Sequence, residues 1–360
     1  MGENQSKTRR FSHLNEDYFL AMTHEFITIL DHARRDKELG IQNVLATVVA
    51  LDGSSYRKPG VRMLLSENGA ITGAVSGGCV EKEVQLRAES VFKDQKPKVI
   101  AYDGRYRLGC EGILYILLEP FLPSAEFIER FYSHVNERKG FTIKSFYQKN
   151  DEIYGHFGSI FYTENGDNHH FSSDFQTNQD NDTLIFEQEM QQLFKLLIIG
   201  GEHDAVKLCS MASLLGWQVD VITSIKDPKT QLDFPGSHTV SAETPENLSL
   251  HNLDAQTAVV LMTHNYAQDL KFLLRLQAVD VAYLGLLGST NRREQLQNDL
   301  FEYAPEIALS FLDKIHSPAG LNLGAVTPEE IALSILSEIV AVTRDKTPHS
   351  LKEATGQIHY

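Results

Sequence analysis

Apolar positions follow two different patterns along the chain, and the pattern changes near residue 193. Within residues 16–123, helical spacing is confined to residues 18–35 and 79–92. The other apolar runs are short and rich in β-branched residues, which predicts strands at 44–51, 61–65, 70–75, 98–102 and 113–118. The turn Glu67-Asn68-Gly69 separates two of these runs, as in a hairpin. We therefore predict a mixed α/β domain over residues 16–123.

The next stretch, residues 124–192, has a less regular pattern. A helix is predicted at 127–135, and strands are predicted at 141–147 and 153–162. Residues 164–183 are crowded with Asn, Asp, Ser, His and Gln, a composition that buries little apolar surface. We interpret 124–192 as a connector that contains strands and an exposed polar loop.

From residue 193 onward, apolar strand patterns alternate with helical ones. Alternation of this kind predicts a parallel sheet with crossover helices, and the glycine-rich turn after the first strand indicates a Rossmann-like domain over 193–346. The last helix opens with Thr327-Pro328-Glu329-Glu330, a capping box, and residues 347–360 form a tail. The predicted fold class is α/β: an N-terminal mixed α/β domain and a C-terminal Rossmann-like parallel-sheet domain. The strands on which this rests are 196–199, 218–222, 258–262 and 281–284.

Charge narrows the range of partners. Lys and Arg total 33 against 48 Asp and Glu, a formal net charge of −15, which argues against nucleic acid because that ligand requires a basic face. No run approaches the ~20 apolar residues of a membrane span, and Met1–Arg10 lacks the apolar centre of a secretory signal. We expect a soluble cytoplasmic protein without a membrane span, in which any anion site is a local pocket.

One loop of the N-terminal domain has the composition of an anion site. Residues 53–60 read G-S-S-Y-R-K-P-G, and another arginine follows at 62. Backbone amides, hydroxyls and guanidinium groups together suit a phosphate-like anion. The alternative is a solvated loop with stray charges. When this loop is considered by itself, we favour that alternative. The candidate ligands are Gly53, Ser54, Arg57 and Arg62.

Two cysteines in glycine-rich loops are candidates for chemistry. If Ser76 is a helix N-cap, Cys79 lies in the first helical turn, where free amides and the helix dipole lower the pKa of a thiol. Cys110 also lies between glycines, just before a strand. The alternatives are small buried thiols or a zinc site, although no C-x-x-C is present. The flanking candidates are Gly77, Gly78 and Gly109, whereas Cys209 lies on an apolar helix face and is interpreted as packing.

The C-terminal domain departs from a dinucleotide fingerprint. Gly200-Gly201-Glu202-His203 follows the first strand, so a carboxylate stands where the backbone of a G-x-G-x-x-G turn meets pyrophosphate. Thr223 ends the second strand where a ribose-binding acid is usual. We therefore do not expect NAD(P) as the cofactor, although Gly200, Gly201 and His203 remain candidate binding residues.

Other polar residues follow later strands of the same predicted sheet. Because the carboxyl ends of parallel strands share one edge, these residues are expected to line one crevice. The alternative is that the glycines and serine only form turns and caps. We favour function for His264, which is also a candidate acid or base alongside Cys79 and Cys110. The remaining candidates are His203, Gly285, Gly288, Ser289 and His316.

Taken together, these motifs resemble those of the XdhC/CoxI family of xanthine dehydrogenase accessory factors. The N-terminal match is G-S-S-Y-R-K-P-G-V-R-M, V-S-G-G-C-V-E and L-G-C-E-G. The C-terminal match is M-T-H-N-Y-A-Q-D, G-L-L-G-S and G-L-N-L-G-A-V-T-P-E-E-I-A. The chain departs from the family pattern at Glu111 and Glu202, where glycine is usual, and at 223–225, where Asp-Pro-Arg is usual.

The resemblance implies an accessory factor that binds the molybdenum cofactor transiently, assists its sulfuration and inserts it into a xanthine dehydrogenase-type hydroxylase. It implies a homodimer, a cysteine desulfurase as a candidate partner, and contact of Cys79 and Cys110 with molybdenum-bound sulfur. Such a protein is a cofactor chaperone more than a turnover enzyme. The alternatives are an NAD(P)-dependent oxidoreductase that uses the Rossmann-like domain, and a scaffold that binds only protein partners.

Overall fold

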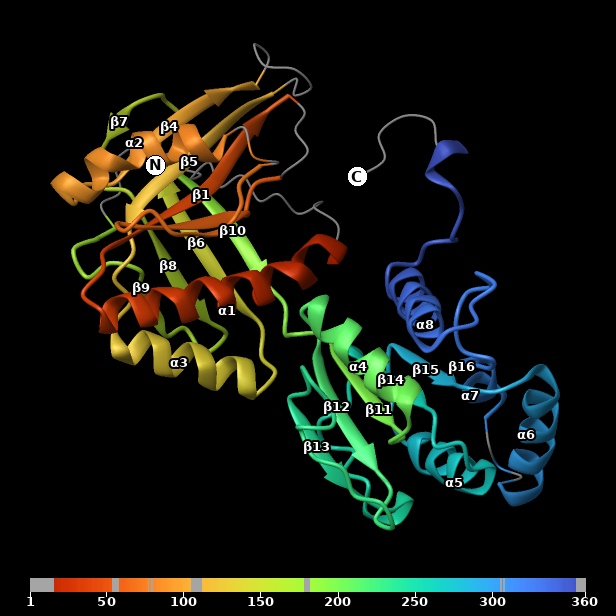
Figure 1. Cartoon of the computed structure of the whole chain (residues 1–360). Helices are drawn as coiled ribbons and strands as arrows, with labels where there is room; N and C mark the ends of the chain where they lie inside the picture. The colour runs from red at the N-terminus through yellow and green to blue at the C-terminus, as the bar shows by residue number, and fades with distance from the viewer. Residues whose placement is uncertain are drawn as a thin grey trace, which may run out of the picture. The chain divides into compact units, whose positions relative to one another are not determined.

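The computed structural model describes residues 16–53, 58–76, 78, 80–104, 112–177, 182–304, 306 and 308–353. The chain divides into two compact units, residues 1–192 and 193–360 (Figure 1). The stretch 124–192, interpreted from the sequence as a connector, groups with the first unit. In the described part of the chain, no helix is both long and apolar enough to cross a membrane.

Unit 1 contains two antiparallel sheets. The larger sheet has the strand order β3-β2-β1-β5-β4-β7, and the smaller one has the order β10-β6-β8-β9. The turn at 67–69 joins β2 to β3, as the sequence predicts. The larger sheet comprises β1 (Asn43–Asp52), β2 (Arg62–Ser66), β3 (Ile71–Gly73), β4 (Lys98–Asp103), β5 (Ile113–Pro120) and β7 (Ile153–Tyr154). The smaller comprises β6 (Phe141–Tyr147), β8 (Gly158–Thr163), β9 (Asn168–His170) and β10 (Leu184–Met190).

An aromatic cluster forms much of the core of unit 1. The rings pack edge-to-face or stacked; Phe26 lies 5.4 Å from Phe131 and 5.6 Å from Phe171, centroid to centroid. Phe171 is fully buried and directly follows β9, so the segment expected to be an exposed loop has a strand and a core residue. Phe175 of the same segment is also buried, and the polar composition around these two residues obscured both. Three helices pack on the strands: α1 (Glu16–Glu38), α2 (Glu81–Asp94) and α3 (Ala125–Asn136).

Unit 2 is built on one parallel sheet with the order β13-β12-β11-β14-β15-β16. Counted within the unit, this is the 3-2-1-4-5-6 order of a Rossmann fold, so the predicted fold class is confirmed. The strands are β11 (Lys195–Ile199), β12 (Gln218–Thr223), β13 (Thr239–Ala242), β14 (Thr257–Leu261), β15 (Tyr283–Leu286) and β16 (Ile315–His316).

Helices cover both faces of this sheet. Helices α4 and α8 pack together on one face, and α5, α6 and α7 pack on the other (Figure 1). The capping box predicted at Thr327 is present, with the Glu330 N–H donating to its side chain. The helices are α4 (His203–Leu214), α5 (Tyr266–Leu276), α6 (Thr290–Tyr303), α7 (Leu309–Asp313) and α8 (Pro328–Thr343), with short 3-10 turns at Pro245–Asn247 and Leu351–Glu353.

Candidate functional site

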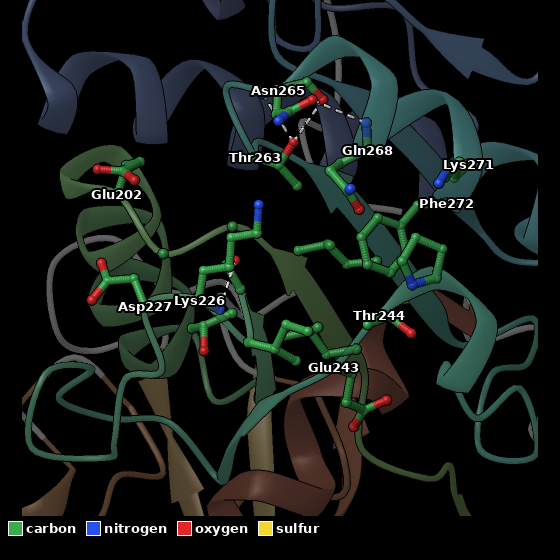
Figure 2. A pocket seen from close by; sticks show the side chains of 18 of the residues that line it. Glu202, Lys226, Asp227, Glu243, Thr244, Thr263, Asn265, Gln268, Lys271 and Phe272 are labelled. Carbon is green, nitrogen blue, oxygen red and sulfur yellow. Dashed lines mark hydrogen bonds between the residues drawn. The ribbon is translucent and has the colours of Figure 1, made fainter.

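A cavity of about 490 Å³ opens at the carboxyl ends of the strands in unit 2 (Figure 2). Its walls come from the turn after β11, the segments after β12 and β13, and the segment that leads from β14 into α5. Strand β11 begins the unit and lies between β12 and β14, so the cavity sits at the point where the strand order reverses. Ligands of open α/β sheets bind at this point, and the cavity is therefore the candidate site.

The turn between β11 and α4 needs a glycine at one position and tolerates a side chain at the next. Gly200 has φ +156°, and a Cβ there would lie 2.4 Å from the Met262 carbonyl oxygen. A Cβ on Gly201 would meet nothing closer than 3.6 Å. Glu202 caps α4 only through its backbone, because its side chain makes no capping hydrogen bond. The Glu202 carboxylate points away from the Lys226 ammonium (Figure 2).

The end of β12 supplies hydroxyl groups and a lysine in place of an acid. Thr223 is buried; its Oγ1 donates to the Ser241 carbonyl at 3.1 Å and accepts from the Lys229 N–H at 3.3 Å. Ser224 Oγ accepts from the Lys226 N–H at 3.2 Å, which closes the turn. Lys226 extends its ammonium into the space between the turn that bears Glu202 and the segment that bears Thr263 (Figure 2).

The wall after β14 is held by a buried charged pair. Thr263 Oγ1 donates to Asp269 at 2.7 Å, and Arg292 of α6 donates to the other carboxylate oxygen of Asp269. Asp269 is fully buried, and this burial raises its pKa. Asn265 caps α5 by accepting from the Gln268 N–H at 3.2 Å. The segment is therefore fixed from both sides, as a wall that binds a ligand requires.

The histidines predicted for one crevice do not line this cavity. His264 has φ +53°, and its half-exposed ring places Nε2 3.9 Å from Asp204 Oδ2. His316 stacks on Tyr283 at 4.5 Å and lies 3.3 Å from the Glu338 carboxylate. Neither histidine lines the cavity. His203, the first residue of α4, also lies outside its lining. The sheet edge is thus divided, and the cavity occupies one part of it.

Gly285 of β15 and Gly288, which follows that strand, also lie outside the cavity lining. A Cβ on Gly285 would lie 2.6 Å from the Tyr283 ring, so this glycine makes room for an aromatic side chain. A Cβ on Gly288 would meet the Arg292 side chain at 2.7 Å. Ser289 is the N-cap of α6 without a side-chain capping bond. These close contacts give both glycines a role in packing, and their role in binding stays a prediction.

Arg62, the described arginine of the predicted anion loop, points into the core. It is buried on β2, donates to the Gly60 carbonyl at 3.0 Å and to Gln188 Oε1 at 2.5 Å, and lies over the Phe26 ring. Burial lowers the pKa of Arg62 to about 10. Gly53 directly follows β1 and has φ +83°. The other predicted ligands of this loop, Ser54 and Arg57, lie outside the described residues.

The helix after Ser76 begins later than predicted. Its N-cap is Val80 and α2 starts at Glu81, so Ser76 is not the N-cap. The Glu81 carboxylate accepts from the Ser76 N–H and Oγ–H at 2.7 and 2.8 Å, and Ser76 Oγ accepts from the Gly78 and Val80 amides, which makes a separate turn. Gly78 has φ +115°, as a glycine permits. The candidates Gly77, Cys79, Gly109 and Cys110 lie outside the described residues.

Cys209 is the cysteine that the described part of the chain contains. Cys209 packs in the core of unit 2, as predicted, and burial raises the pKa of its thiol to about 11. Over the residues that the structure describes, no group of three or more His, Cys, Asp or Glu side chains could hold a metal ion.

Several residues that line the cavity were not among the candidates predicted from the sequence. Lys226 lies beyond the end of β12, and Gln268 and Phe272 are residues of α5. The signal was present for Lys226, because it lies three residues after the end of the second strand, where ribose-binding groups are usual. The departure at 223–225 indicates the loss of an acid, whereas the lysine directly after it indicates a cation in its place.

Two antiparallel sheets followed by a 3-2-1-4-5-6 parallel sheet with a cavity at its carboxyl edge define a two-unit protein with a Rossmann-like domain. The chain belongs to the XdhC and CoxI family. A model of that family matches residues 38–103, and a model of the XdhC Rossmann domain matches residues 196–339. The resemblance inferred from the motifs is confirmed.

Three relatives extend over most of the chain. A probable subunit of xanthine dehydrogenase from Bacillus subtilis is 30% identical over 88% of this chain and 96% of its own length. The molybdenum cofactor insertion chaperone PaoD of Escherichia coli is 25% identical over 92% of each chain. A crystal structure described as a xanthine dehydrogenase from Bacillus halodurans covers 89% of this chain and 97% of its own, with a TM-score of 0.70 and 23% identity, and it supports the fold.

Proposed function

We propose that the protein is an accessory factor that binds molybdenum cofactor, assists its sulfuration and inserts it into a xanthine dehydrogenase-type hydroxylase. The observation that carries this proposal is the full-length similarity to a chaperone named for molybdenum cofactor insertion and to a probable xanthine dehydrogenase subunit. The protein then acts as a cytoplasmic chaperone, as a homodimer, with the apoenzyme as its partner and a cysteine desulfurase as the sulfur source.

The groups on the chain suit the chemistry of that cargo. Molybdopterin carries a phosphate, a polar pterin and sulfur bound to molybdenum. The cavity of unit 2 offers the Lys226 ammonium, the Gln268 amide and the Phe272 ring. Thiolates suit soft metal–sulfur groups, and Cys79 and Cys110 are the residues we assign to that contact. His264 then remains a candidate proton carrier beside the cavity.

Cofactor retention tests the proposal directly. Purified protein is mixed with molybdenum cofactor released from a molybdoenzyme, and the pterin that elutes with the protein on a sizing column is measured. We expect wild type and Cys209→Ala, a packing control, to retain pterin, and the double variant Cys79→Ala/Cys110→Ala to lose most of it. No retention by wild type, or equal retention by the double variant, would overturn the proposal.

Delivery is tested with an apoenzyme. Loaded protein is added to a cofactor-free xanthine dehydrogenase-type enzyme, and recovered turnover and cyanide-labile sulfur are measured with and without a cysteine desulfurase. We expect turnover to need the loaded protein and labile sulfur to need the desulfurase. Equal activation by free cofactor alone would remove the chaperone role.

The strand order of unit 2 favours one second candidate, an NAD(P)-dependent oxidoreductase. Glu202 at the glycine turn and Thr223 at the end of β12 oppose NAD binding in the usual manner. A screen for substrate-dependent reduction of NAD⁺ or NADP⁺ by purified protein separates the two. Turnover without any apoenzyme would favour the oxidoreductase.

A further inference from the structure

We infer that the end of β12 forms a subsite for a phosphomonoester inside the cavity of unit 2, with the Lys226 ammonium as its principal cation. Where the ester is the phosphate of molybdopterin, the inference rests on the proposed function. Where it is the 2′-phosphate of a ribose, it stands independently. The shared chemistry is a terminal, dianionic phosphate, and the experiment below distinguishes the two sources.

The first observation is the state of Lys226 itself. Its side chain lines the cavity and its ammonium extends into it (Figure 2). Within the described ranges, no carboxylate lies close enough to Lys226 to form an ion pair. The cation is therefore available to a ligand, in contrast to Lys195, whose ammonium lies 3.1 Å from Asp220.

The second observation is that most acids around the cavity are already engaged. Asp227 pairs with Lys229 at 2.7 Å, Glu243 accepts from Ser241 Oγ at 2.8 Å, and Glu246 faces Lys271 at 4.0 Å. The carboxylate of Glu202 points away from the Lys226 ammonium (Figure 2). The repulsion that an acidic protein offers an anion is thus reduced at this point of the cavity.

The third observation is the position of the lysine in the fold. Strand β12 is the second strand of a 3-2-1-4-5-6 sheet, and the residues after it select the group on the ribose 2′ position in Rossmann domains. An acid there pairs with a free hydroxyl, and a basic residue accommodates a phosphate. Here the strand ends in Thr223, and Ser224 and Lys226 follow. The Ser224 hydroxyl and the Lys226 ammonium match a phosphate, because Asp227, the acid that follows them, is paired with Lys229.

The turn that presents these groups is already formed. Ser224 accepts from the Lys226 N–H through Oγ at 3.2 Å and from the Asp227 N–H through its carbonyl at 3.1 Å. Its own hydroxyl hydrogen stays available to an anion, because the oxygen acts as acceptor in the turn. The phosphate is placed here rather than on the β11–α4 turn, where Glu202 would face it.

Matched ligand pairs that differ by one phosphate test the inference. The first pair is NADPH and NADH, which differ at the ribose 2′ position; the second is metal-free molybdopterin before and after phosphatase treatment. Calorimetric titration of the full chain should show at least one pair whose phosphorylated member binds about ten-fold tighter or more. Inorganic phosphate should compete with it. Which pair discriminates identifies the source of the phosphate.

Three variants decide whether Lys226 is responsible. Lys226→Ala and Ser224→Asp should bring the two members of the discriminating pair within about two-fold of each other. Lys314→Ala, which removes an exposed lysine paired with Asp280 on the far part of the unit, should leave the difference unchanged. Unchanged Trp217 fluorescence verifies the fold of each variant. Equal binding within both pairs by wild type, or a difference that survives Lys226→Ala, would overturn the inference.

This test fails separately from the proposed function. Loss of phosphate discrimination with intact cofactor retention rejects the subsite alone. Discrimination of NADPH from NADH without cofactor retention rejects the molybdenum role and keeps the subsite.

Discussion

At the scale of single residues, unit 1 contains a carboxyl group where water does not reach it. Glu119 of β5 is 1% exposed and accepts from the Ser159 N–H at 2.8 Å and from Ser159 Oγ at 2.6 Å. Burial raises the pKa of Glu119 to about 7, although Ser159 and the nearby Arg62 act in the opposite direction. The side chain therefore titrates near neutral pH inside the core, which makes the stability of the unit dependent on pH.

The sign of that dependence follows from proton binding. Between the ordinary pKa of 4.5 and the native value of about 7, the native state keeps a proton that the unfolded state has released. Stability contributed by Glu119 is therefore lost as the pH rises through this window, with a slope of at most about 1.4 kcal/mol per pH unit. Glu119→Gln should flatten the curve between pH 5 and 7, measured by urea unfolding with circular dichroism. The same slope in both proteins would contradict this.

The buried pair beside the cavity gives a second prediction. Asp269 is fully buried and bonded to Arg292, so Asp269→Ala leaves an arginine without its partner and should lower the unfolding free energy by about 3 kcal/mol. The matched control is Asp280→Ala, because the pair of Asp280 with Lys314 is exposed and should contribute less than about 1 kcal/mol. Urea unfolding followed by the fluorescence of the single tryptophan, Trp217, measures both. Equal losses would show that burial of the pair is not decisive.

At the scale of elements, the turn between β11 and α4 combines a fixed backbone with an open one. A Cβ on Gly200 would lie 2.4 Å from the Met262 carbonyl oxygen, so the turn runs close to the residue that follows β14. Gly201 lines the cavity. A Cβ there would have its nearest neighbour at 3.6 Å, which is an ordinary van der Waals distance. Two neighbouring glycines therefore serve different ends, the first for folding and the second for access.

Alanine at each glycine separates these roles. Gly200→Ala should cost about 2 kcal/mol or more, because the new Cβ meets a backbone oxygen that cannot move independently. Gly201→Ala should change stability by less than about 1 kcal/mol while narrowing the cavity. Trp217 fluorescence in urea reports the first effect, and ligand titration reports the second. A large loss of stability from Gly201→Ala would refute the division.

At the scale of the whole molecule, each unit has cores of its own. The hydrophobic clusters of described residues fall entirely within residues 1–192 or entirely within 193–360. The ring of the single tryptophan, Trp217, packs against Phe194 at a tilt, with ring centroids 4.7 Å apart, and reports unit 2 alone. Separate cores are the condition for separate folding.

Expression of residues 193–360 alone tests this independence. We expect the fragment to unfold cooperatively in urea, with a tryptophan transition close to the one seen in the full chain. A fragment without a cooperative transition would mean that unit 2 needs the rest of the protein. Calorimetry of the full chain should correspondingly show two transitions.

The sequence predicted the fold better than the site, for physical reasons. Alternating apolar strands and helices specify a parallel sheet locally, and the capping box at Thr327 is a short-range signal. The site depends on which strand ends face the same cavity, which no spacing encodes. His264 and Lys226 both follow strands, yet only the second lines the cavity, because the His264 backbone turns left-handed toward Asp204. Phe171 and Phe175 show the same limit in the core, since both are buried although the stretch around them is polar.

The lengths of the outermost strands have a consequence for how the native protein can self-associate. Over the part of the chain described, the sheets end on β3, β7, β9, β13 and β16, none longer than four residues, and on β10, which α1 packs against. Short or covered edges leave little unpaired backbone for strand addition by another molecule. Self-association of the native protein should therefore proceed through side chains, and amyloid-like stacking should require prior unfolding.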